Sequence, residues 1–142
     1  MKTIPLMQVA ILIPAVFYAA FLDWKTRRIP NVLSAFIAIG GVTYLAVEHS
    51  MATALGGLTQ GVIAGLACMP IYLVRGMSAG DVKLISATSI WWTATQLLIA
   101  LAATAIVGAI LAVIYICATR DATHVPYAMA IATSTIGTAL TV

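Results

Sequence analysis

Long stretches without a charged residue constrain this chain more than any other feature. Five such windows cover residues 3–22, 29–47, 50–74, 84–119 and 122–142. About 20 consecutive apolar residues are enough for a helix to cross the hydrocarbon core of a bilayer. The composition agrees, because 63% of the 142 residues are hydrophobic and only 8% are charged, against about 25% charged in soluble domains. The sequence therefore predicts an all-α membrane protein surrounded by a lipid bilayer.

The window over residues 84–119 is too long for one span and predicts a helical hairpin with its turn near residues 91–96. Trp91 and Trp92 would then lie in the headgroup belt, where indole rings concentrate. The fourth helix must begin near Gly80 to reach a spanning length. The prediction is a single domain, residues 1–142, with helices over 3–22, 30–47, 52–74, 80–94, 97–118 and 125–142.

The basic residues predict an orientation for this six-helix bundle. The loops after the first, third and fifth helices carry six of the seven: Lys25, Arg27, Arg28, Arg75, Lys83 and Arg120. The other side carries Lys2, with Glu48 and His49. By the positive-inside rule the first side is cytoplasmic, so both termini lie outside the cytoplasm. The scattered charges form no basic run with interleaved aromatic residues, so nucleic acid is not an expected partner.

Two further patterns concern packing rather than chemistry. Gly57, Gly61 and Gly65 recur every four residues and form a smooth stripe that allows helices to approach closely. Packing within the bundle is the favoured interpretation, and dimerisation is the alternative, so the oligomeric state is open. Cys68 and Cys117 lack the spacing of a metal or redox site. We expect neither a metal nor a cofactor.

The four acidic residues separate into two kinds. Glu48 lies in a short external turn and Asp121 in a cytoplasmic loop beside basic residues, so solvation or local pairing explains both. Asp23 lies at the C-terminal end of the first helix, where a carboxylate opposes the helix dipole, and an interfacial ion pair is the alternative explanation. Asp81 lies near the start of the fourth helix, where an N-cap role is the alternative.

Asp23 and Asp81 fall at the same cytoplasmic level in this topology. Ionisable residues at membrane depth are costly and are candidates for function. Two carboxyls brought together do not both ionise easily, so one keeps its proton. The ionised carboxylate can take a proton from water while the protonated carboxyl polarises a carbonyl. This pair therefore predicts hydrolysis of an amide bond.

Three motifs carry a resemblance to a known family. The first span is followed by "DWKTRRIPN", a later span opens with "AGDVKL", and the last helix begins with "VPYAMAIA". In order, spacing and six-span layout, the chain resembles the type IV prepilin peptidases over nearly its whole length. It is most similar to the small Tad/Flp-pilus class of these GxGD intramembrane aspartic proteases. Ser78 stands where the family motif has its first glycine.

The resemblance implies that Asp23 and Asp81 are the catalytic pair and that the substrate is a prepilin. Such a substrate has a short basic leader ahead of a hydrophobic helix, and the cut falls at the cytoplasmic face of the bacterial inner membrane. Residues that the resemblance implies to shape the site or bind substrate are Gly80, Lys83, Arg27, Arg28, Pro30, Asn31 and Tyr127. For Lys83, Arg27 and Arg28, anchoring at the membrane interface is the favoured alternative. The chain lacks the cysteine-containing region of the larger, methylating members, so we expect proteolysis without methyl transfer.

Two other functions are compatible with part of the pattern. A small membrane transporter or channel component would place its acids near the bilayer midplane, facing a pore. In this chain the acids lie at span ends, which disfavours that function. A protease of the same chemistry could instead act on another substrate, such as a preflagellin.

Overall fold

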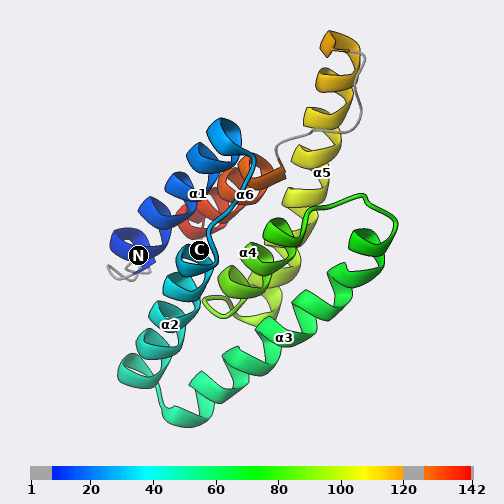
Figure 1. The fold of residues 1–142 in the computed structure, drawn as a ribbon. Coiled ribbons are helices and arrows are strands. Elements are labelled where there is room, and N and C mark those ends of the chain that lie inside the picture. The colour runs from blue at the N-terminus through cyan, green and yellow to red at the C-terminus, as the bar shows by residue number, and fades with distance from the viewer. Residues whose placement is uncertain (1–7, 120–126, 142) are drawn as a thin grey trace.

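The computed structural model of the chain describes residues 8–119 and 127–141, and all regular structure within them is helical (Figure 1). A short π-helical turn, η1 Gln8–Leu12, leads into the α-helices. These are α1 Ile13–Thr26, α2 Asn31–Glu48, α3 Met51–Leu73, α4 Ala79–Ser89, α5 Ala94–Thr119 and α6 Tyr127–Thr141. The all-α prediction is confirmed for this part of the chain. The predictions made for Lys2, Arg120 and Asp121 lie outside the described residues.

Three helices among the described residues are long and apolar enough to cross a membrane, namely α2, α3 and α5. α4 differs from its predicted span, since it ends at Ser89 instead of residue 94. Its 11 residues correspond to about 16 Å of helix at 1.5 Å per residue, which is roughly half the hydrocarbon thickness. α4 therefore does not cross a bilayer by itself.

The turn after α4 explains why this helix stops early. The N–H groups of Trp91 and Trp92 donate to carbonyls three residues back, at 3.1 and 3.4 Å, which tightens the chain into a turn. Thr93 and Gln96 then start α5 with a reciprocal cap. The Thr93 N–H donates to Gln96 Oε1 at 2.8 Å, and the Gln96 N–H donates to Thr93 Oγ1 at 3.4 Å. The predicted hairpin turn is confirmed, and α5 begins three residues earlier than expected.

The two tryptophans of this turn are buried, with only 2% and 5% of their surfaces exposed for Trp91 and Trp92. The prediction that they lie in a headgroup belt is therefore wrong. Trp91 Nε1 donates to the Ile37 carbonyl of α2 at 2.9 Å, and its ring stacks on Tyr44 with 5.5 Å between centroids. Gly41 makes room for it, since a Cβ there would lie 2.8 Å from Trp91 Nε1. Trp91 thus anchors the turn against α2.

We expect Trp91→Phe to destabilise the protein by about 1–3 kcal/mol, because it removes the hydrogen bond to Ile37 and leaves a void. Thermal unfolding of the purified protein in detergent measures the effect. Trp24→Phe is the matched control, because Trp24 is 69% exposed and its indole has little packing to lose. Equal melting temperatures for the two variants would contradict a structural role for Trp91.

The glycine stripe of α3 packs against α4. A Cβ on Gly61 would lie 2.8 Å from the Ser86 carbonyl oxygen and 2.9 Å from Ile90 Cγ1. Gln60 of α3 adds hydrogen bonds from its Nε2 to the carbonyls that end α4 and its turn, at 3.0 and 2.8 Å. The interpretation of the stripe as packing within the bundle is confirmed.

α6 packs on both α1 and α5 (Figure 1). A buried hydrogen bond joins the hydroxyls of Thr104 in α5 and Ser134 in α6. At the start of α6 the Tyr127 ring lies over Gly108, where a Cβ would come within 3.1 Å of it. These contacts set the position of the N-terminus of α6.

Candidate active site

Asp81 belongs to a capping box that begins α4. Ser78 Oγ accepts the Asp81 N–H at 3.2 Å, and Asp81 Oδ2 accepts the Ser78 N–H at 3.0 Å. The N-cap is therefore Ser78, and the alternative explanation of Asp81 as the N-cap residue is wrong. The Ser78 hydroxyl thus begins α4 with a side-chain cap.

Capping accounts for only one of the two carboxyl oxygens of Asp81. The side chain is 3% exposed, and its Oδ1 is buried without a hydrogen-bond partner among the described residues. Leaving a buried polar atom unsatisfied costs about 1–3 kcal/mol. The capping contact needs only Oδ2 and does not explain why Oδ1 is buried. Oδ1 is therefore available for another role.

Asp23 lies in the last turn of α1, which continues to Thr26 and is closed by Arg27. Arg27 adopts a left-handed conformation with φ of 53°, and its N–H donates to the Asp23 carbonyl at 2.8 Å. The half-buried Asp23 carboxyl accepts a hydrogen bond from the backbone N–H of Ala128, in the first turn of α6. The end of α1 therefore meets the start of α6.

The two carboxyls lie within electrostatic reach of each other. Asp23 directly follows the first predicted span. Burial raises the pKa of its carboxyl above the ordinary value of 3.8, and the neighbouring Asp81 raises it further. The hydrogen bond from Ala128 and the charge of Arg27 act in the opposite direction. The fold thus brings the Asp23 and Asp81 carboxyls near each other.

Each carboxyl also lies at the N-terminus of a helix. Asp81 is in the first turn of α4, and Asp23 contacts the first turn of α6. Helix N-termini carry a partial positive charge that favours an anionic group. The dipole of α1 opposes Asp23, as predicted from the sequence, but the dipole of α6 compensates for it.

The segment between α1 and α2 crosses over the start of α4. A Cβ on Gly80 would lie 3.3 Å from Ile29 Cβ, so the absence of a side chain allows this close approach. Pro30 is the N-cap of α2 with extended backbone angles, φ −62° and ψ 136°, and a proline also keeps the residue before it extended. The "RRIPN" motif therefore carries the chain past Gly80, while Arg27 and Arg28 remain exposed.

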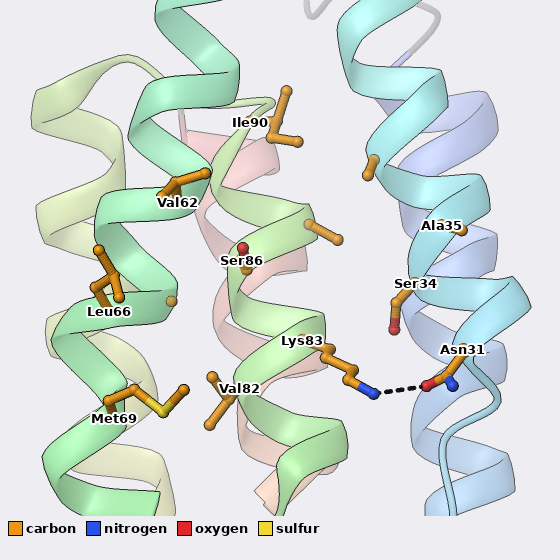
Figure 2. Close-up of a pocket in the computed structure, with 13 residues that line it drawn as sticks. Asn31, Ser34, Ala35, Val62, Leu66, Met69, Val82, Lys83, Ser86 and Ile90 are labelled. Atoms are coloured by element: carbon orange, nitrogen blue, oxygen red, sulfur yellow. Dashed lines mark hydrogen bonds between the residues drawn. The ribbon is translucent and has the colours of Figure 1, made fainter.

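Lys83 and Asn31, also predicted to shape the site, face away from Asp81. Two residues along an α-helix correspond to about 200° of rotation, so Lys83 lies on nearly the opposite side of α4. Its Nζ donates to Asn31 Oδ1 at 2.9 Å across a groove (Figure 2). Tyr127 contacts Gly108 of α5, and its neighbour Ala128 is the residue that bonds to Asp23.

Sequence reasoning missed Ser78 and Ala128 as parts of this arrangement. The spacing S-x-x-D was a readable capping-box signal for Ser78. Ala128 acts through its backbone N–H, for which no side chain gives a signal, although it lies within the motif "VPYAMAIA". Among the residues that the structure describes, no three His, Cys, Asp or Glu side chains gather in a way that could hold a metal ion.

Comparison with known families decides what kind of protein carries this pair. A sequence model of the type IV leader peptidase family matches residues 10–113, which is more than half of the chain. The chain belongs to the type IV leader peptidase family. The match includes both Asp23 and Asp81 and ends before α6. No curated protein and no solved structure was found to match the chain.

Membership of the type IV leader peptidase family places the chain among peptidases and confirms the family resemblance, and two of the three motifs lie within the matched residues. The three long apolar helices fit a peptidase that acts at a membrane. The match contains α1 and α4, two of the three helices that meet at the pair, and α6 supplies the remaining contact from outside it.

The raised pKa of Asp23 predicts a pH-dependent effect on stability. Folding favours its protonated carboxyl, so this contribution to stability is fully present below pH 3.8 and is lost as the pH rises through the raised pKa. We expect Asp23→Asn to raise the melting temperature at pH 7.5, and we expect the gain to shrink as the pH falls through the raised pKa and to disappear below about pH 4. Thermal unfolding across this range measures it. Glu48→Gln, at an exposed carboxyl, is the control, and a lower melting temperature for Asp23→Asn at pH 7.5 would contradict the prediction.

Proposed function

We propose that this chain is a membrane aspartic endopeptidase that removes the short leader from Flp-type type IV prepilins. The observation that carries the proposal is the convergence of Asp23 and Asp81 at the ends of α1, α4 and α6, in a chain of the leader peptidase family. Cleavage of a co-expressed prepilin, measured as a size shift on a gel, tests it. The two aspartates are the proposed catalytic residues.

The two carboxyls supply an acid and a base. Because they interact, they titrate as a unit, and one of them holds its proton more readily than an isolated carboxyl does. The ionised carboxylate takes a proton from water, whose oxygen attacks the scissile carbonyl, while the protonated carboxyl donates to the carbonyl oxygen. The carboxyl that received the water proton then donates it to the leaving amine as the C–N bond breaks. The other carboxylate takes back a proton from one hydroxyl of the intermediate, which restores the starting state of the pair. The unpartnered Oδ1 of Asp81 is a position from which a water or a carbonyl can be contacted.

The proposed location is the cytoplasmic face of the bacterial inner membrane, with both termini on the other side. Lys25, Arg27 and Arg28 end α1 beside Asp23, and Arg75 precedes α4. The positive-inside rule puts these basic residues, and with them the aspartates, on the cytoplasmic side. A prepilin leader is cytoplasmic, so its cleavage site and the aspartates meet at one level.

A preflagellin is the alternative substrate, because it too would present a leader ahead of an apolar helix to the same chemistry. Family membership disfavours a transporter or channel component. Parallel cleavage assays on the two kinds of precursor distinguish the substrates.

We expect the purified protein to cleave without methylating the new N-terminus. Its six helices leave no additional cytoplasmic region among the described residues, and Cys68 and Cys117 lie in α3 and α5. Incubation with radiolabelled S-adenosylmethionine and cleaved pilin measures methyl transfer, with a methylating family member as the positive control. Label incorporated into the pilin would contradict this prediction.

A further inference from the structure

A groove lies on the side of α4 that faces away from Asp81. α2 and α3 are joined by a tight turn and diverge from it, and α4 lies between them (Figure 1). The groove has a volume of about 480 Å³. Val82, Ser86 and Ile90 of α4 form its floor, and side chains such as Ala35 of α2 and Leu66 of α3 form its walls (Figure 2). It is therefore separate from the aspartate pair.

The groove is apolar along its length and cationic at one end. Lys83 is the only charged residue among those that line it, and no carboxylate is present among them. Lys83 Nζ reaches across the end to Asn31 Oδ1 at 2.9 Å (Figure 2). Lys83 retains further N–H donors, and the Asn31 amide adds its own. This end offers a positive charge and several hydrogen-bond donors to an anion.

The dimensions of the groove suit a single acyl chain. From Val82 to Ile90 the floor is about 12 Å long at 1.5 Å per residue. A volume of about 480 Å³ over that length leaves room for an extended chain of methylene groups. A single hydrocarbon chain fits these dimensions.

The positive charge of Lys83 favours an anionic lipid. A basic prepilin leader would be repelled by Lys83, whereas a phosphate would be attracted to it. Basic pockets between transmembrane helices on the cytoplasmic side are suited to anionic lipid headgroups. We propose that this groove binds one anionic phospholipid, with an acyl chain along Val82, Ser86 and Ile90 and its phosphate at Lys83 and Asn31. This site is independent of the proposed peptidase function.

Native mass spectrometry of the full-length protein in detergent tests the site. Phosphatidylglycerol and phosphatidylcholine with the same acyl chains are added in parallel, and retained adducts are counted. We expect phosphatidylglycerol to be retained about fivefold more, the preference that one lysine near a membrane surface supplies. Lys83→Gln should remove this preference and leave phosphatidylcholine retention unchanged. Lys25→Gln, which removes an exposed lysine outside the groove, is the matched control and should keep it.

Filling the groove tests the acyl chain separately from the headgroup. Ala38→Phe on the α2 wall and Val62→Trp on the α3 wall should each lower retention of both lipids. Ile39→Phe, on the exposed side of α2 outside the groove, is the control and should not. Each variant is compared at an unchanged melting temperature, and the two walls provide independent variants if one fails to fold.

Three results would overturn the proposal. Equal retention of the two lipids by the wild-type protein would remove the anionic site. An undiminished preference in Lys83→Gln would place the phosphate elsewhere. Displacement of phosphatidylglycerol by a peptide that corresponds to the apolar helix of a pilin would assign the groove to a protein helix instead.

Discussion

Asp23→Asn and Asp81→Asn are each expected to reduce prepilin cleavage by at least about 10³-fold, within the range that general acid–base groups contribute. Either change leaves a single carboxyl, which can act as a base or as an acid but cannot exchange both protons during the reaction. Asn preserves the local structure, because its oxygen can still accept the N–H of Ala128 in place of Asp23 and that of Ser78 in place of Asp81. The loss therefore reports chemistry and not folding.

Co-expression of a candidate prepilin with wild-type protein and with each variant, followed by a size shift on a gel, measures the effect. Glu48→Gln is the control, because this exposed acid lies at the end of α2 opposite to Asn31. It should cleave at the wild-type rate. If either aspartate variant processes prepilin at the wild-type rate, the catalytic assignment is wrong. Cleavage by wild-type protein and Glu48→Gln alone would support the paired-aspartate mechanism.

Gly61→Leu is expected to destabilise the protein by about 3 kcal/mol or more, the upper part of the range for overpacking a well-packed contact. The added side chain has no space, since even a Cβ would meet the Ser86 carbonyl oxygen at 2.8 Å. A backbone atom cannot rotate away as a side chain does, so α3 must move off α4. Because α4 carries Asp81, cleavage should be lost together with stability.

Gly56→Leu provides a matched control on the same helix. A Cβ on Gly56 has nothing within 4 Å, and replacing glycine within a helix stabilises it by up to about 1 kcal/mol. Thermal unfolding of both variants in detergent, with the cleavage assay alongside, separates the two effects. Equal melting temperatures for Gly56→Leu and Gly61→Leu would show that close α3–α4 contact does not hold the site together.

The long helices were predictable because their cause is local. α2 and α3 begin and end within one residue of the predicted bounds, 30–47 and 52–74. Each apolar residue contributes its own favourable free energy of transfer into hydrocarbon, almost independently of its neighbours. The uncharged windows therefore determine these helices. The topology implied by these windows also predicted that Asp23 and Asp81 lie at one level, and the fold brings the two carboxyls near each other.

The short helix α4 was not predictable in the same way. Its apolar window continues past Ser89 without a charge, so hydropathy provides no end signal. The end is set by Trp91, which reaches across to Ile37 and requires Gly41 to leave space. Such a contact joins residues about 50 positions apart, and no periodicity within either segment reveals it.

By itself, the sequence determined the helical class and the position of the long apolar helices. It also singled out Asp23 and Asp81 as the two acidic residues that are candidates for function. Only the tertiary structure decided what surrounds those acids. The N-terminus of α6 stabilises Asp23, Ser78 engages one oxygen of Asp81, and the other oxygen is left buried without a partner. The physical reason is that hydropathy acts residue by residue, whereas hydrogen bonds and helix dipoles depend on which distant segments the packing brings together.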